Sequence, residues 1–389
     1  MNRIIENLHK NYPGMIKFLQ SLIRINSVNN HETKVAKVIQ NKLREYGIKS
    51  KLIGKNKMRK SLIALVKGKK GGKSIMLNGH LDTVAVGDLK KWRCDPFSAK
   101  FVNGKIYGRG SHDTKGGVAA MIYSVISILG SGTKLNGDII LVFNSDEEGG
   151  DHAGIREVLN SGVKADACIN GEPTRKNRLR IGSRGIYRFK LITKGKTGHT
   201  GSIKKEGINA VMKMAKILLA LDNMKPKYKK HKLCPPPRIN PGTIIKGGSA
   251  INIVPDRCEA LIDYRLSLGQ TKKTLLNEIR RTINSLVKKD KEISYETREI
   301  AYCPAYITNK KEEIVAVSVK NIKKNLGIKP TFIVSGPITD GNFIFKRGIP
   351  VVTLGPKGDN SHSENEFVYA KSMLDVAKVY SSIVLDFLN

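Results

Sequence analysis

The first 174 residues alternate between short apolar runs and amphipathic stretches. The apolar runs predict buried strands over residues 61–68, 74–84, 138–148 and 165–174. Apolar positions at helical spacing predict helices near the N-terminus and over residues 118–129. Strands separated by helices at these distances are typical of a mostly parallel sheet with helices on both faces, so we expect an α/β fold. Ligands bind outside the carboxyl ends of such strands, where several acidic and histidine residues lie.

The pattern changes near residue 185 and returns after residue 301. Amphipathic strands and two helices are predicted in between, over residues 187–195, 209–224, 242–248, 258–268 and 273–290. Such a set predicts a small α+β unit, with an exposed lysine- and proline-rich loop inside it. Strand-like runs and a closing amphipathic helix follow, over residues 332–336, 350–356 and 369–388. We therefore expect one domain formed by residues 1–184 and 302–389, into which a second domain, residues 185–301, is inserted.

Length and composition fit two globular domains in a reducing compartment. The chain has 389 residues, 40% of them hydrophobic and 26% charged, and no apolar run reaches the roughly 20 residues of a membrane helix. The N-terminal apolar residues are spaced among charges, unlike the compact apolar block of a signal peptide. The five cysteines are scattered and contain no CxxC pair, so we expect them to be reduced. These features favour a cytoplasmic protein without a membrane partner.

The net charge of +36 raises the alternative of a nucleic-acid-binding protein. The lysines, however, are spread over many short clusters, and no regular aromatic positions accompany them as a base-stacking surface would require. We therefore interpret the charge as a solvated surface and do not expect nucleic acid as a partner. A nucleic-acid-binding protein on an inactive enzyme fold stays a remote alternative.

Carboxylates and histidines follow the predicted strands. His80 and Asp82 are two residues apart at a strand end, so both side chains project to one side. One of them can bind a metal while the other orients that ligand. Asp113 lies in a glycine-rich turn before a helix, either as a metal ligand or as a helix cap. Glu147 and Glu148 are adjacent carboxylates, which repel each other unless a cation lies between them.

Two further residues complete a candidate metal site. Glu172 ends another strand, and His362 lies far along the chain in a polar loop. Mixed nitrogen and oxygen ligands suit zinc, cobalt or manganese better than calcium. Two histidines and three carboxylates are too many for one four-coordinate ion, but two ions can share them if one carboxylate bridges. One of the adjacent glutamates is then free to accept a proton from water.

A series of short motifs resembles the M20 metallopeptidase family over nearly the whole chain. In order they are GHLDTV, WRCDPF, GRGSHDTKGG, DEEGG, GEPT, GHTGS and HSENE. The resemblance implies a zinc-exopeptidase-like catalytic domain with an inserted dimerisation or lid domain, and two Zn²⁺ ions per chain, with Co²⁺ or Mn²⁺ as substitutes. It implies as metal ligands His80, Asp113, Glu148, Glu172 and His362. It excludes His112, the neighbour of the bridging Asp113.

The resemblance also implies roles for other residues. Glu147 would be the general base and acid, and Asp82 would orient His80. The chain would form a homodimer through the inserted domain, and His199 would polarise the scissile carbonyl in the partner's active site. Asn252 and Arg265 match residues that hold the substrate carboxylate, a task that suits a guanidinium. Arg184 and Thr339 also fall in substrate-proximal segments, although each could equally be a surface or turn residue.

The resemblance implies hydrolysis of an amide bond in a small substrate. We expect removal of an acyl group from an N-acyl amino acid, as in acetylornithine deacetylase or succinyl-diaminopimelate desuccinylase. A metallo-dipeptidase or carboxypeptidase acting on a dipeptide is the alternative. The segment SGPITDGNF has Pro337 and Ile338 where the family's deacylases have smaller residues, so the acyl group stays open.

Overall fold

A computed structural model describes residues 1–28, 31–174, 177–203 and 207–389 of the chain. These residues form two compact units. The larger comprises Met1–Gly182, Thr308–Ile333 and Thr339–Asn389, and the smaller comprises Ser183–Ile307 and Val334–Ile338. In the described part of the chain, no helix is both long and apolar enough to cross a membrane.

A nine-stranded sheet forms the centre of the larger unit, in the order β1-β2-β6-β3-β7-β15-β8-β13, with β14 also paired to β8. Its strands are β1 (Ser50–Ile53), β2 (Ser61–Val66), β3 (Ser74–His80), β6 (Asp138–Asn144), β7 (Ala167–Asn170), β8 (Arg178–Ser183), β13 (Tyr306–Ile307), β14 (Thr331–Ser335) and β15 (Val351–Thr353). The four central strands β6, β3, β7 and β15 are parallel to one another. This arrangement confirms the predicted mostly parallel α/β sheet.

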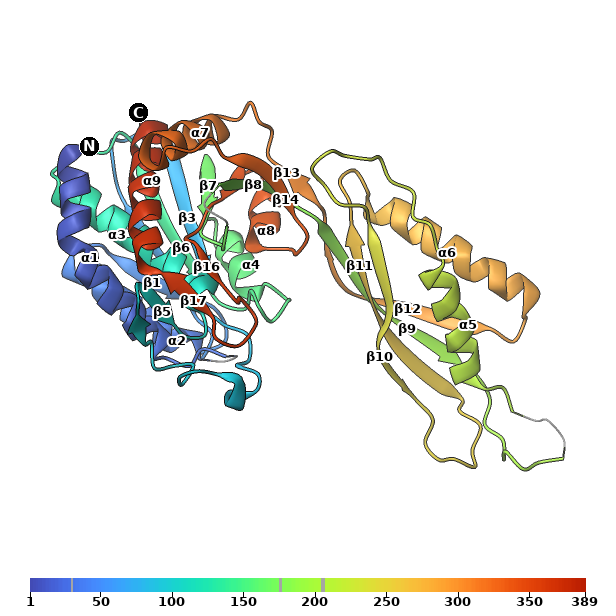
Figure 1. Cartoon of the computed structure of the whole chain (residues 1–389). Coiled ribbons are helices and arrows are strands. Elements are labelled where there is room, and N and C mark those ends of the chain that lie inside the picture. The colour runs from blue at the N-terminus through green and yellow to red at the C-terminus, as the bar shows by residue number, and fades with distance from the viewer. Residues whose placement is uncertain (29–30, 175–176, 204–206) are drawn as a thin grey trace. The chain divides into compact units, whose positions relative to one another are not determined.

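Helices cover the sheet on both faces (Figure 1). They are α1 (Asn2–Ile23), α2 (Glu32–Glu45), α3 (Gly116–Gly130), α4 (Ala153–Asn160), α7 (Glu313–Leu326), α8 (Asp340–Lys346) and α9 (Ala370–Leu388). Helices α1, α3, α7 and α9 pack together, and α3 and α9 contact β3, while α4 and α8 pack against each other and against neighbouring strands. Helix α3 is almost completely buried because nearly all of its residues are apolar or small.

A second sheet of short strands lies beside the carboxyl edge of the main one. Its order is β16-β17-β5-β4, from β16 (Gly358–Asp359), β17 (Phe367–Tyr369), β5 (Lys105–Tyr107) and β4 (Phe101–Val102). It joins the segment before Asp113 to the segment around His362, because β17 pairs with β5. Strands of two or three residues carry no periodic apolar pattern, so the sequence did not predict this sheet.

The smaller unit is an antiparallel four-stranded sheet with two helices on one face (Figure 1). The strands are β9 (Gly185–Lys194), β10 (Arg238–Gly247), β11 (Arg257–Leu266) and β12 (Ser294–Cys303), in the order β10-β11-β9-β12, and the helices are α5 (Ala210–Asp222) and α6 (Lys272–Lys289). Alternate residues of β11 are buried beneath the helices, as expected for a sheet covered on one side.

The boundaries of the units differ in detail from the predicted domains. Residues 334–338 and 302–307, which the sequence pattern assigned to the first domain, group with the smaller unit. The backbone explains the first difference, because Arg184 N donates to Ser335 O at 2.9 Å and the Ser183 hydroxyl donates to Pro337 O.

Candidate active site

The parallel strands of the main sheet end at one edge, and the candidate residues lie at that edge. Strand β3 ends at His80, β6 ends three residues before Glu147, and β7 ends two residues before Glu172. The three strands are adjacent and in register, so the loops that follow them meet. Asp113 reaches the same place from the turn before α3, and His362 from the loop between β16 and β17.

Asp113 lies at the centre of the cluster. Its Oδ1 is 3.1 Å from His80 Nε2, and its Oδ2 is 3.3 Å from His362 Nε2. On the two flanks, Glu172 Oε1 lies 3.6 Å from His80 Nε2, and Glu148 Oε1 lies 3.0 Å from His362 Nε2. The five predicted ligands therefore form two triads that share one aspartate.

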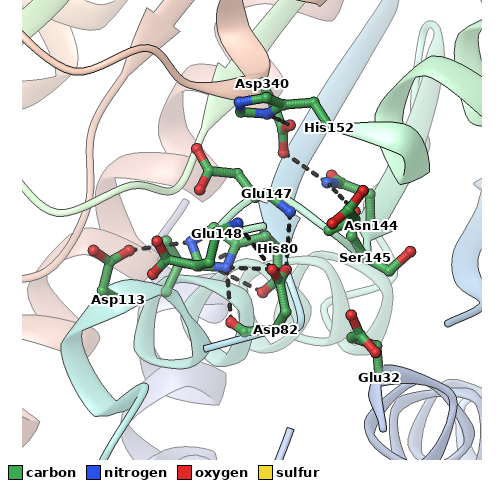
Figure 2. Close-up of polar contacts among 12 residues, drawn as sticks. Glu32, His80, Asp82, Asp113, Asn144, Ser145, Glu147, Glu148, His152 and Asp340 are labelled. Carbon is green, nitrogen blue, oxygen red and sulfur yellow. Dashed lines mark hydrogen bonds and ion pairs between the residues drawn. The ribbon is translucent and has the colours of Figure 1, made fainter. Parts of the chain in front are cut away.

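Asp82 is buried beneath His80 and holds the glutamate loop (Figure 2). Its backbone oxygen is 3.0 Å from His80 Nδ1, while its carboxylate accepts from Glu147 N at 3.2 Å and Glu148 N at 2.9 Å. The backbone oxygen of Asp82 therefore orients the His80 imidazole, because the Asp82 carboxylate lies farther from His80 Nδ1, at 3.7 Å. The carboxylate instead fixes the loop that carries both glutamates.

Glu366 fixes the loop that carries Asp113, as Asp82 fixes the loop that carries Glu147 and Glu148. Its carboxylate accepts from the backbone N–H groups of Gly110, His112 and Asp113 at 2.9 to 3.0 Å, and from Arg109 Nη1 at 2.8 Å. Both Glu366 and Arg109 are buried. The loop before α3 thus depends on a single carboxylate located about 250 residues farther along the chain.

Replacing Glu366 by alanine is expected to lower the free energy of unfolding by about 3–5 kcal/mol, because it leaves the buried Arg109 charge and three N–H groups without their acceptor. Denaturant unfolding of the metal-free protein measures the loss. Glu364→Ala, in the same loop, is the matched control and should change the value by less than about 0.5 kcal/mol. Equal losses in the two variants would contradict the assigned role.

Crowded acids and histidines shift one another's pKa values. Burial and the nearby Asp113 charge raise the pKa of Glu172 to about 8, and burial with the Glu172 charge raises the pKa of Glu147 well above its usual value. Hydrogen bonds with Asp113 and Glu148 raise the pKa of His362 to about 10. Burial lowers the pKa of His80, but Asp113 and the surrounding acids raise it overall.

These residues fit a pair of metal ions. The described residues contain three groups whose ligand atoms all lie within 4.8 Å of one another, namely His80 with Asp113 and Glu172, His80 with Glu147 and Glu148, and Asp113 with Glu148 and His362. Glu172 Oε1 is buried and has no hydrogen-bond donor among the described residues. A cation would satisfy this oxygen and relieve the repulsion between carboxylates.

The affinity of the His80–Asp113–Glu172 triad for a metal ion is expected to rise with pH by about 100-fold per unit between pH 6 and 7, and that of the Asp113–Glu148–His362 triad by about tenfold per unit. At these pH values the metal-free centre holds protons on His80, whose pKa is raised well above its usual value, on Glu172, with a pKa of about 8, and on His362, with a pKa of about 10. Each ligand must lose its proton before it binds, and each proton released contributes about tenfold per pH unit. Competition titrations with a buffered chelator measure the slopes, and an affinity independent of pH would show that none of these protonated groups is a ligand.

His112 and Thr339 lie close to the site in different ways. The His112 imidazole pairs with the Ser361 hydroxyl at 2.8 Å and belongs to none of the three groups. Thr339 is buried at the start of α8, where its N–H donates to Asn342 Oδ1 at 3.1 Å. This position suits a capping residue, and its contact with substrate stays a prediction.

The four candidate residues of the smaller unit form two separate pairs. His199 and Asn252 are exposed and lie in neighbouring loops, since His199 bridges Ile253 and Thr200 N donates to Asn252 O at 3.1 Å. Arg184 and Arg265 lie together at the other end of β9, where burial and then the Arg265 charge lower the pKa of Arg184. From Ile186 to Lys194, β9 spans eight residue steps, or about 26 Å. One smaller unit therefore cannot bring both pairs to the same substrate.

Arg265 is already paired within the smaller unit. Its Nε lies 2.7 Å from Asp263 Oδ1 and its Nη2 lies 3.1 Å from Asp263 Oδ2, while Arg188 Nε shares the second oxygen at 3.1 Å. A substrate carboxylate bound by Arg265 would have to share the guanidinium with Asp263. The sequence spacing of Asp263 and Arg265, two apart on one strand, could have indicated this pair.

Sequence reasoning missed a set of buried polar residues around the site. They are Asn78, Arg109, Asn144, His152, Asn170, Asp340 and Glu366. A signal was present for three of them, because an asparagine stands at or near the end of β3, β6 and β7, in NGH, NSD and NGE. A polar residue repeated where apolar strands end suggests a shared contact below the site.

A sheet whose strand ends gather two histidines and four carboxylates defines the class of metal-dependent hydrolases. A model of peptidase family M20/M25/M40 matches residues 76–386, so the chain belongs to this family. A succinyl-diaminopimelate desuccinylase of Rickettsia bellii is 28% identical over 383 residues, covering 96% of each chain. One from Rhodospirillum centenum is 31% identical over 328 residues, covering 80% of this chain and 81% of the relative.

Solved structures share the fold over the whole chain. Aminopeptidase PepT of Bacillus cereus has a TM-score of 0.80 at 20% identity and covers 97% of this chain and 99% of its own. A dinuclear metal-binding M20 peptidase of Bacillus subtilis has a TM-score of 0.75 at 18% identity, covering 98% and 99%. At these identities the likeness establishes the architecture alone.

Proposed function

We propose that the chain is a two-zinc deacylase that removes an acyl group from an N-acyl amino acid, with N-succinyl-diaminopimelate as the first candidate substrate. The two triads around Asp113 carry the proposal, since a shared carboxylate between two ligand sets is the arrangement of a dinuclear hydrolytic centre. The names of the relatives from Rickettsia bellii and Rhodospirillum centenum support the succinyl group.

In this proposal each triad holds one zinc ion. His80, Asp113 and Glu172 form the first set, and Asp113, Glu148 and His362 form the second. Nitrogen and oxygen ligands without thiolates suit zinc, and cobalt or manganese could replace it. When bound, the ions supply electrostatic stabilisation of the charge that develops on the amide oxygen and favour ionisation of water at neutral pH.

Glu147 is the proposed general base and acid. Its N–H is fixed by Asp82, and its side chain is largely buried beside the two triads. Burial raises its pKa, so the carboxylate is a stronger proton acceptor than an exposed glutamate would be. It would accept a proton from the attacking water and return it to the leaving amine. Asp82 keeps this carboxylate and the His80 ring in place.

We propose a homodimer in which His199 acts on the partner's substrate. The distance between the two residue pairs of the smaller unit supports this arrangement, because His199 and Asn252 cannot share a pocket with Arg184 and Arg265 of their own unit. The edge strand β10 exposes Ile244 and Ile245, each 51% exposed. An apolar edge strand is a suitable surface for pairing with a second copy.

Mixing two inactive variants tests the dimer. Glu147→Ala and His199→Ala homodimers should each have little activity. Mixed dimers should recover up to about a quarter of the wild-type activity at equal concentrations, because half of the dimers then contain one site with both residues intact. Chromatography must show dimers that exchange subunits. Absence of recovery in exchanging dimers would place His199 outside the partner's site.

A substrate panel tests the proposed function. The zinc- or cobalt-loaded protein is assayed with N-succinyl-diaminopimelate, N-acetylornithine, other acyl amino acids and dipeptides. We expect the highest kcat/KM for an acyl amino acid. Preference for dipeptides would assign the chain to the peptidases of its family, and no hydrolysis of any amide by protein that binds two ions would refute the proposal.

We place the reaction in the cytoplasm. The described residues contain no disulfide, and four of the five cysteines are buried. Buried cysteines outside any disulfide suit a reducing compartment.

A further inference from the structure

A chain of buried amides crosses the main sheet beneath the candidate active site. Asn144 Nδ2 donates to Asp340 Oδ2 at 2.6 Å, and Asn78 Nδ2 donates to Asn144 Oδ1 at 2.7 Å. Asn170 Nδ2 donates to Asn78 Oδ1 at 2.8 Å, and the backbone N–H of Glu172 donates to Asn170 Oδ1 at 3.1 Å. All four side chains are fully buried. The chain of hydrogen bonds therefore runs without a break from Asp340 to a proposed metal ligand.

The carboxylate of Asp340 at one end and the N–H of Glu172 at the other give every bond in this chain the same direction. An ionised carboxylate only accepts hydrogen bonds, so Asn144 must present its amide nitrogen to Asp340 and its oxygen to Asn78. The same constraint passes to Asn170, whose oxygen must then face the backbone of Glu172. An amide in place of Asp340 could face either way, so the Asn144 end of the chain would lose its fixed direction, although Val142 O and the Glu172 N–H still orient Asn78 and Asn170.

The second carboxylate oxygen of Asp340 contacts the loop that contains Glu147 and Glu148. Asp340 Oδ1 is 2.9 Å from His152 Nδ1, and both side chains are buried (Figure 2). His152 has a φ of 50°, a left-handed conformation that costs free energy in a residue other than glycine. It ends the loop that contains Glu147 and Glu148 and begins α4. The contact with Asp340 keeps this strained residue in place.

We infer that Asp340 is a positioning residue that sets the spacing between the Glu148 loop and the Glu172 loop, through His152 on one side and the three asparagines on the other. This inference rests on the proposed metal centre, because the two loops supply ligands to different triads. A small change in their separation would move one ligand away from its ion. Residues that support ligands in this way typically contribute about 10- to 100-fold to metal affinity or activity.

Cobalt binding tests the inference independently of catalysis. The visible absorption of bound Co²⁺ reports the geometry of its ligands, so Asp340→Asn should change the spectrum and weaken binding of at least one Co²⁺ by about tenfold or more. With N-succinyl-diaminopimelate, kcat should fall by about 10- to 100-fold while KM changes by less than about threefold. Asn170→Ala removes the acceptor of the Glu172 N–H together with the donor to Asn78 Oδ1, and should change the spectrum in the same direction.

Two control variants separate positioning from loss of stability. Asp166 accepts from Ser74 N and Oγ at the opposite edge of the same sheet, so Asp166→Asn removes a carboxylate far from the ligand loops. Ile139→Val destabilises the core of β6 by about 0.5–1.5 kcal/mol without touching the amide chain. Both should retain the wild-type cobalt spectrum and affinities.

The outcomes are distinct. Wild-type spectra and affinities in Asp340→Asn and Asn170→Ala would overturn the inference, as would equal changes in the two controls. If Asp340→Asn does not fold, Asn170→Ala decides alone. A wild-type protein that binds no cobalt would overturn the metal centre and this inference together, whereas two bound ions with no amide hydrolysis would refute only the proposed reaction.

Discussion

Replacing Glu147 by alanine should reduce kcat by about 10² to 10⁴-fold while the protein still binds two metal ions. The carboxylate lies beside both triads, but neither of the triads that share Asp113 needs it. Burial raises its pKa, which means that the folded protein disfavours its charge. Removal of Glu147 should therefore leave the free energy of unfolding unchanged or raise it. Steady-state kinetics with zinc-loaded protein and metal analysis after gel filtration provide the two measurements.

Asp151→Asn is the matched control for Glu147→Ala. Asp151 is an exposed acid four residues along the same loop, so its loss changes the loop's charge and leaves the site intact. We expect kcat within about twofold of wild type for this variant. If Glu147→Ala retained most of the activity, the proton would have to be carried by another group, and the assignment of Glu147 would be wrong.

Replacing Asp113 by alanine should abolish both metal sites, whereas replacing His362 should abolish only one. Asp113 contacts both histidines, with oxygens 3.1 Å from His80 and 3.3 Å from His362. It is the one residue that the two proposed metal-binding triads have in common. Cobalt bound per chain should fall from two to near zero in Asp113→Ala and from two to about one in His362→Ala. Activity should fall to the background rate in the first variant.

Glu172→Ala is the matching variant for the buried side of the centre and should also retain about one ion. If Asp113→Ala still bound one ion tightly, the aspartate would serve a single site, and the proposed bridge would be refuted. Thermal unfolding of the metal-free proteins controls for folding, because Asp113 also pairs with both histidines when no metal is present.

The proposed metal ligands could be predicted from the sequence, but the buried residues that hold their loops could not. His80 ends one apolar strand, Glu148 and Glu172 follow two others, and parallel strands in register bring such positions together. Asp340 and Glu366 could not be assigned this way, because each acts on a loop that lies roughly 190 to 250 residues away in the chain. Nothing in the local pattern distinguishes a buried acid of this kind from an exposed one.

The fold shows the same division between periodic and irregular segments. The limits of β3, β6, α3 and α9 agree with the predicted elements to within a few residues, because each has a long run of buried residues. Helices α4 and α8 are short, with eight and seven residues, and were not predicted. Arg265 was interpreted from its residue type alone, which suits a substrate carboxylate, although Asp263 two residues earlier on the same predicted strand already indicated an ion pair.

The two sides of the centre differ in their access to water. The side chain of His362 is 53% exposed, whereas that of His80 is 1% exposed and that of Glu172 is 9% exposed. Ions and chelators from solution therefore meet the His362 side first, and exchange there should be much faster than at the His80 side. Two different metals could then be installed in a chosen order, the slowly exchanging one first. Each half of the pair would become separately visible to spectroscopy.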